Sequence, residues 1–142
     1  MGSGIFSRGV DAIRRWEMFN IGWVKLCWPD TPIEPGSIVA VLAYHIGLWS
    51  LNACRIVTVI DEDKPIRRYG FIYATLPGHA ERGEERFTVE WRKDDDSVWY
   101  DILAYSKPNQ LLVKAGYPIA RMLQKQFARD SMAAMLRSVS RD

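Results

Sequence analysis

Residues 86–93 constrain the fold most, because apolar and polar side chains alternate along them one by one. One face of the expected strand carries Phe87, Val89 and Trp91. The other face carries Arg86, Thr88, Glu90 and Arg92. A period of two is typical of an antiparallel sheet that buries one face and leaves the other in water. This stretch therefore predicts a strand in a one-sided sheet.

Four more segments have the composition of short strands and follow one another at the spacing of an antiparallel meander. They are residues 37–44, 53–61, 68–76 and 97–106. In the third of these, Tyr69, Phe71 and Tyr73 share one face. The acidic run at 94–96 favours a hairpin turn, because Asp side chains hydrogen-bond readily to turn backbone. Together the pattern predicts about five strands in one sheet.

An amphipathic segment near the N-terminus predicts a helix. Its apolar stripe is Phe6, Val10, Ile13 and Trp16, at helical spacing. The small residues at 1–4 are expected to be flexible, and Gly22 should help to end the helix. The sheet is thus expected to follow an N-terminal helix and an irregular, proline-rich crossing at 29–36.

A second, longer helix is expected at the C-terminus. Pro108 should begin it, because proline suits a first helical turn, and Gly116 with Pro118 should kink or divide it. Its apolar stripe is Leu111, Leu112, Ala115, Ile119, Leu123, Phe127 and Ala134. The basic side chains Arg121, Lys125 and Arg129 form a ridge that we interpret as a solvated face. The fold class is therefore α+β, with a helix at each end of the sheet.

Length and composition limit the class of protein. The 142 residues suit one domain, 1–142, and no run approaches the roughly 18 apolar residues of a membrane span. Basic residues come too early for a signal peptide, so a cytoplasmic location is expected. A net charge of +2 without a basic patch argues against nucleic-acid binding. Cys27 and Cys54 lack metal-site spacing, so a structural zinc site is not expected. No metal-binding residue and no cofactor is assigned from the sequence.

Four stretches are familiar as a set: residues 16–23, 70–79, 83–87 and 106–108. They resemble the bacterial and plant family known as domain of unknown function nineteen-ninety, over nearly the whole chain. The stretch at 70–79 is the most specific. Members of that family usually begin with a further segment that includes a strand, so this chain is expected to lack the family's N-terminal strand. The resemblance implies no activity, because the family has none established.

The order of elements is similar to that of the helix-grip fold of START and birch-pollen-allergen-like proteins. This similarity implies a curved antiparallel sheet that wraps a long C-terminal helix around an apolar cavity. The leading hypothesis is therefore a domain that binds an apolar or amphipathic small molecule, such as a lipid, between sheet and helix. The expected ligand-binding residues are Tyr69, Phe71, Tyr73, Phe87, Trp91, Leu112, Ile119, Leu123 and Tyr44. The simpler interpretation is a filled core made of the same rings.

The second hypothesis is an enzyme that uses a histidine with nearby carboxylates for acid–base or metal-assisted chemistry. The candidates lie in an expected loop over 76–85: His79, Glu81, Glu84 and Glu85. A histidine titrates near neutral pH, and a carboxylate can fix its tautomer. The simpler interpretation is a tight hairpin in which His79 bonds to loop backbone.

The third hypothesis is a structural or protein-interaction module. An absent first strand would leave one edge of the sheet unpaired, and an unpaired edge favours pairing with another chain. Homo-oligomers through that edge are expected in this case.

Overall fold

The computed structural model describes residues 2–45, 47–76, 81–108 and 117–140. Helix α1 (Gly2–Arg14) leads into the short 3-10 helix η1 (Glu17–Phe19), and the chain ends in helix α3 (Tyr117–Ser140). The strands between them are β1 (Val24–Leu26), β2 (Ile38–His45), β3 (Leu48–Glu62), β4 (Arg67–Thr75), β5 (Glu81–Arg92) and β6 (Ser97–Pro108). Each strand pairs antiparallel with the next, in the order β1-β2-β3-β4-β5-β6.

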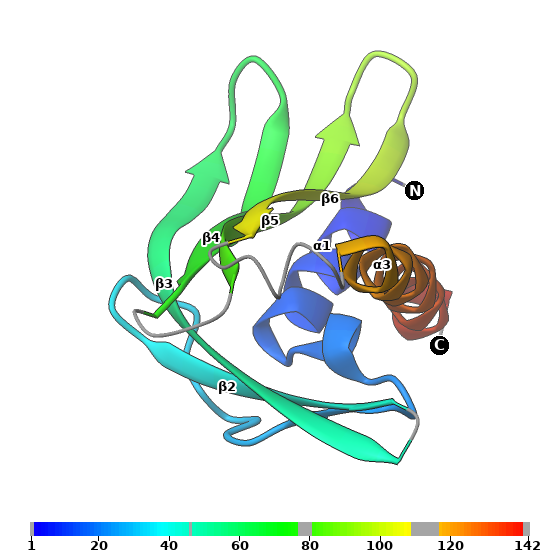
Figure 1. The fold of residues 1–142 in the computed structure, drawn as a ribbon. Coiled ribbons are helices and arrows are strands. Elements are labelled where there is room, and N and C mark those ends of the chain that lie inside the picture. Colours follow the sequence, from blue (N-terminus) through cyan, green and yellow to red (C-terminus); the bar gives the residue numbers. More distant parts are fainter. Residues whose placement is uncertain (1, 46, 77–80, 109–116, 141–142) are drawn as a thin grey trace.

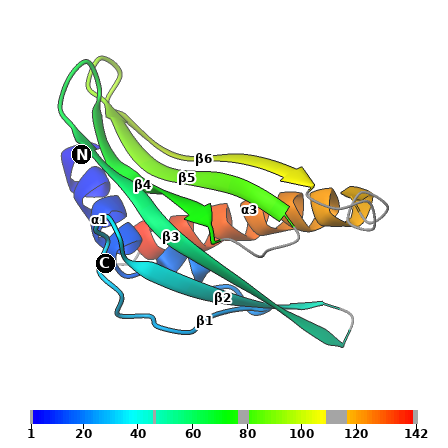
Figure 2. The same ribbon diagram turned by 60° about the vertical axis from the view of Figure 1, so that its left-hand side comes forward.

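The sheet curls into a half-barrel around the N-terminal helices (Figure 1). α1 and η1 lie on its inner face, and α3 lies on the open side between β6 and the start of β1 (Figure 1). Turned to the side, the first turns of α3 lie beside the end of β6 (Figure 2). The α+β class and the helix-grip-like arrangement expected from the sequence are confirmed.

Several boundaries differ from those expected. The sheet has six strands rather than about five, because the short, mixed stretch of β1 was not recognisable as a strand. α1 begins at Gly2, which is buried, so residues 2–4 form the first turn of a helix rather than the flexible start expected there. Pro108 ends β6 instead of beginning a helix. α3 is one helix from Tyr117, and Pro118 sits in its first turn, where no backbone N–H is needed.

Aromatic rings dominate the core between the sheet and the N-terminal helices. Trp16 has a left-handed backbone conformation (φ 60°), which reverses the chain after α1 and turns its indole inward. The ring of Trp16 contacts Phe71 at 5.1 Å, and that of Phe19 contacts Phe87 at 5.6 Å, centroid to centroid. Gly9 lets α1 approach β5, since a Cβ there would lie 2.9 Å from Cγ1 of Val89. The apolar stripe that the sequence predicts for the N-terminal helix, Phe6, Val10, Ile13 and Trp16, is therefore buried against the sheet.

α3 closes the open side of the half-barrel through two hydrogen bonds to opposite edges of the sheet. The indole Nε1 of Trp23, just before β1, donates to Asp130 Oδ2 at 2.8 Å. The hydroxyls of Tyr100 on β6 and Ser131 are 2.9 Å apart. No helix in the described part of the chain is both long and apolar enough to span a bilayer.

The outer face of β5 is less wet than its sequence predicts. Thr88 is fully buried and Glu90 is 8% exposed. The guanidinium of Arg68 covers the Glu90 carboxylate at 3.1 Å, and Arg92 approaches it at 3.6 Å. Paired charges on neighbouring positions thus shield this face, and the expectation that Thr88 and Glu90 face water is wrong.

Candidate functional site

The inner face of the half-barrel changes character along β4 and β5. Near the β5–β6 turn its cross-strand rows are apolar, with Tyr69 opposite Val89 and Phe71 opposite Phe87. Residues opposite each other on paired strands point to the same side of the sheet. The next row places Tyr73 opposite Glu85, so the Glu85 carboxyl also points inward. A carboxyl therefore stands where the aromatic rows stop.

The row of Glu85 is open to solvent on its β6 side. Glu85 pairs with Ala104, and the two side chains therefore share the inner face. Ala104 is exposed, whereas Ile102, one step nearer the aromatic rows, packs against the core. The small, exposed side chain of Ala104 shows that α1 and η1 leave this part of the concave inner face uncovered.

α3 brings an apolar side chain to the same level. Its Ser131 meets Tyr100, and its Phe127 ring lies 6.4 Å from that of Phe87, the neighbour of Ile102. Four residues of α3 span about 6 Å along the helix, and two residues of β6 span about 6.7 Å along the strand. One helical turn of α3 therefore corresponds to about one cross-strand row of the sheet. On this spacing we expect half-buried Leu123 at about the level of the Glu85 row.

The carboxyl of Glu85 is held by one tyrosine. The Tyr73 hydroxyl donates to Glu85 Oε1 at 3.2 Å. Burial raises the pKa of Glu85 from 4.5 to about 7, and the hydrogen bond from Tyr73 opposes part of this rise. Glu85 is half-buried as a residue, so the protein desolvates the carboxyl while one side of the row stays accessible. The group is therefore partly protonated near neutral pH.

The titratable neighbours of Glu85 are themselves neutral. Burial, with a smaller contribution from the negative charge of Glu85, raises the pKa of the Cys54 thiol to about 12. The same two causes raise the pKa of Tyr73, and burial raises the pKa of Tyr100. We define the Glu85 site as Glu85, Tyr73, Cys54, Ala104 and Leu123. It can accept or donate a proton near pH 7 and can hold a cationic or hydrogen-bonding group beside an apolar surface.

The predicted aromatic wall lies mostly under protein. Tyr69, Phe71, Tyr73 and Phe87 are all nearly or fully buried. The rings of Phe71, Tyr73 and Phe87 pack on one another and on Trp16 and Phe19, and the guanidinium of Arg14 lies over the ring of Tyr69. Partly buried Trp91 donates its indole N–H to Asp96 at 3.0 Å and packs against Phe6. Of the expected ligand-binding residues, the structure places Tyr73 directly opposite Glu85.

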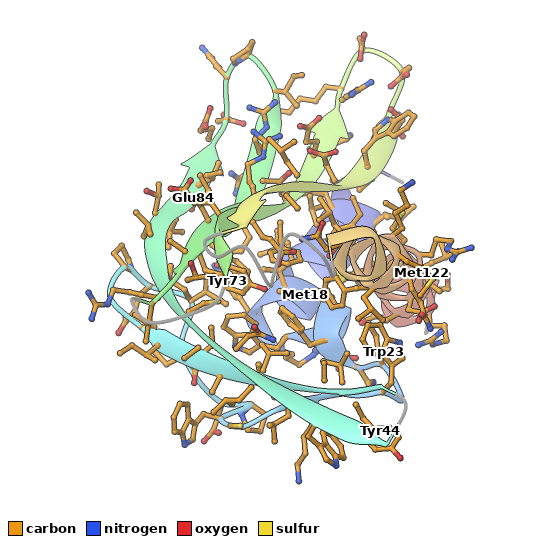
Figure 3. The ribbon with its side chains drawn as sticks, viewed as in Figure 1. Met18, Trp23, Tyr44, Tyr73, Glu84 and Met122 are labelled. Atoms are coloured by element: carbon orange, nitrogen blue, oxygen red, sulfur yellow. The ribbon has the colours of Figure 1, made fainter. Side chains whose placement is uncertain are left out.

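Tyr44 is not brought to the others. Its neighbours on β2, Val39 and Val41, face the core, so Tyr44 faces outward, 43% exposed, with its ring 5.0 Å from that of Trp49 (Figure 3). Leu112 and His79 lie outside the described residues, as do the side chains of Ile119 and Glu81.

Glu84 and Glu85, expected to act near one loop, lie in β5 and point to opposite faces of the sheet. Glu84 is exposed on the outer face, away from Tyr73 (Figure 3). In the part of the chain that the structure describes, no three His, Cys, Asp or Glu side chains gather as metal ligands. Of Glu84 and Glu85, only Glu85 therefore remains a candidate for acid–base chemistry.

Sequence reasoning missed Cys54 and Ala104 as parts of this site, and it missed η1 as the cover of the rings. A signal for the inward direction of Glu85 was present. Val89 and Phe87 alternate toward the core with a period of two residues. The same period places Glu85, two residues before Phe87, on the inner face. No comparable signal marks Cys54, whose position depends on the register between β3 and β4.

Comparison with known proteins gives a family match over most of the chain. The family model described as Domain of unknown function (DUF1990) matches residues 1–134. A UPF0548 protein of Dictyostelium discoideum is 37% identical over 150 residues, covering 98% of this chain and 69% of that protein. A UPF0548 protein of Arabidopsis thaliana is 34% identical over 146 residues, covering 99% and 70%. One of Deinococcus radiodurans is 32% identical over 148 residues, covering 96% and 72%. No solved structure shows a significant match.

Proposed function

Since the chain belongs to the family described as Domain of unknown function (DUF1990), whose description names no activity, we propose from its geometry that it binds an amphipathic small molecule. The ligand lies between the inner face of the sheet and α3, at the Glu85 site. Its apolar part contacts Leu123 and Ala104, and its polar group meets the carboxyl of Glu85. Ligand sites commonly combine an apolar lining with a few polar groups that fix orientation.

One observation carries this proposal. The inner face is filled by rings up to the row of Phe71 and Phe87, and the next row carries a desolvated carboxyl beside an exposed Ala104. A desolvated carboxyl without a function would normally be replaced or paired, because burial of an ionisable group costs free energy. The end of the aromatic packing at this row supports a site for a ligand there.

A matched pair of tryptophan substitutions tests the proposal. Ala104→Trp adds bulk on the inner face beside Glu85, whereas Leu103→Trp adds it on the outer face of the same strand, where Leu103 is 56% exposed. The probe is dodecanol, titrated by isothermal calorimetry into the purified protein. We expect Ala104→Trp to weaken dodecanol binding by about tenfold or more, and Leu103→Trp to leave it unchanged. Equal affinity in both variants, or no binding by the unmodified protein, would overturn the proposal.

Native mass spectrometry gives an independent reading of the same site. The protein purified from cells should retain a small molecule that dissociates on collisional activation. The Ala104→Trp variant should retain less of it than Leu103→Trp does. Circular dichroism of both variants checks that each is folded, so that lost binding reports on the site.

A further inference from the structure

Glu85 is a half-buried carboxylate of the inner face that has no cationic partner among the described side chains. Elsewhere, carboxylates meet arginine or lysine: Asp101 meets Arg86 at 3.0 Å, and Glu90 meets Arg68 at 3.1 Å. Those pairs lie on the outer face of the sheet. The partner of Glu85 is the neutral hydroxyl of Tyr73. The inner face thus holds a carboxylate whose charge the described side chains do not balance.

The described titratable groups that face Glu85 come from three strands, and none of them is cationic. They are Tyr73 on β4, Cys54 on β3 and Tyr100 on β6. Across the open side, Asp130 of α3 accepts a hydrogen bond from Trp23, and Lys125 is exposed to solvent. The carboxylate of Glu17 on η1 accepts a hydrogen bond from Asn20 at the surface. None of the described side chains therefore balances the negative charge of Glu85.

The described residues also use only part of the hydrogen-bonding capacity of Glu85. An ionised carboxylate can accept about four hydrogen bonds, and Tyr73 supplies one, to Oε1. The exposed inner position of Ala104 gives access to the same row. A primary ammonium carries three hydrogen-bond donors and a positive charge. It can therefore supply both the donors and the positive charge that the described side chains do not give Glu85. A neutral hydroxyl supplies a donor without the charge, and a carboxylate adds a second negative charge.

We propose that the Glu85 site selects ligands with a cationic amine head group, which binds the Glu85 carboxylate while an alkyl or other apolar tail lies against Leu123. This inference rests on the proposed function and gives the ligand a chemical class. The tail explains the position of the site between sheet and α3, and the amine explains why a carboxyl without a described cationic partner is kept on the inner face.

Three probes with the same apolar tail test the head group: dodecylamine, dodecanol and dodecanoate. Each is titrated by isothermal calorimetry at pH 8, at concentrations below its solubility limit and below any micelle-forming concentration. At that pH the amine is cationic and Glu85 is largely ionised. A hydrogen bond between charged groups is stronger than one between neutral groups, so we expect dodecylamine to bind about tenfold tighter than dodecanol. Dodecanoate should bind most weakly.

Two isosteric variants locate the effect. Glu85→Gln should abolish the preference for dodecylamine over dodecanol, while Glu84→Gln, one residue away on the outer face, should preserve it. Lowering the pH to 5.5 should reduce the preference in the unmodified protein, because Glu85 becomes mostly protonated. Circular dichroism confirms that both variants remain folded.

The outcomes separate this inference from the proposed function. Equal binding of dodecylamine and dodecanol, or a preference for dodecanoate, overturns the amine inference and leaves the proposed function standing. A preference that survives Glu85→Gln also overturns the inference, since the amine would then bind elsewhere. Failure of all three probes to bind contradicts both.

Discussion

The hydroxyl of Tyr73 donates a hydrogen bond to the carboxyl of Glu85 across the β4–β5 pair, 3.2 Å from oxygen to oxygen. Tyr73 belongs to the aromatic core, with its ring 5.5 Å from that of Phe87. Glu85 belongs to the row where the core ends. This pair marks the boundary between the packed part of the inner face and the part that we assign to ligand binding.

Glu85 should make stability depend on pH. Its pKa is about 7 in the folded protein and near 4.5 when unfolded. A raised pKa favours the protonated, folded form, so this contribution is complete below pH 4.5 and is lost as the pH rises through 7. Glu85→Gln removes the penalty and should raise the free energy of unfolding at pH 8 by on the order of 2–3 kcal/mol, with little change at pH 4.

Urea denaturation of the unmodified protein, Glu85→Gln and Glu84→Gln at pH 4, 6 and 8 measures this effect. The difference between unmodified protein and Glu85→Gln should grow with pH, and exposed Glu84→Gln should change stability by less than about 0.5 kcal/mol. A difference that is the same at all three pH values would mean that Glu85 titrates normally.

Gly70 permits the close approach of β4 to β5. A Cβ at this position would overlap the carbonyl oxygen of Phe87 and lie 2.8 Å from Cα of Thr88. Gly70→Ala should therefore destabilise the protein by more than about 3 kcal/mol, measured by thermal denaturation. Gly4→Ala is the control, because a Cβ at Gly4 in α1 meets nothing within 4 Å. Similar melting temperatures for the two variants would show that the strands can separate without strain.

The hydrogen bond between Trp23 and Asp130 should couple α3 to the first strand. A double-mutant cycle with Trp23→Phe and Asp130→Ala isolates this interaction from the packing of the indole. We expect a coupling free energy of about 1 kcal/mol in urea denaturation. A coupling near zero would indicate that α3 is held to that side of the half-barrel by packing alone.

Cys54 should resist alkylation in the folded protein. Its thiol is 3% exposed, and burial raises its pKa to about 12, so the reactive thiolate is scarce at pH 8. Cys27 is partly exposed. Iodoacetamide followed by peptide mass spectrometry should show Cys27 modified at least about tenfold faster, with both thiols reacting in urea. Equal rates in the native protein would show that solvent reaches the inner face at Cys54.

The sequence predicts the regular parts of this fold well, because periodicity reports directly on burial. Phe87 and Val89 alternate toward the core as expected, and the hairpin turn after β5 is present, with the backbone N–H of Ser97 donating to Asp95 at 3.1 Å. The resemblance to the family is confirmed by the match over residues 1–134. Local pattern was sufficient for these features.

Other features depend on tertiary contacts that a local pattern does not carry. The run from Glu81 to Glu85 is so polar that it predicts a loop, yet it forms the start of β5 because β4 and β6 pair with it on both sides. The C-terminal helix was expected to cover the rings, but Trp16 and Phe19 cover them, since a left-handed turn at Trp16 folds η1 inward. The candidate site followed from these two features and could not be assembled without them.

A crystal structure of the protein with dodecylamine, grown at pH 8, tests the account most directly. It should show the amine nitrogen about 3 Å from a carboxylate oxygen of Glu85, with the alkyl chain between the inner face of the sheet and Leu123. Dodecylamine bound elsewhere, with Glu85 contacting Tyr73 alone and the space beside Ala104 filled by protein, would contradict it.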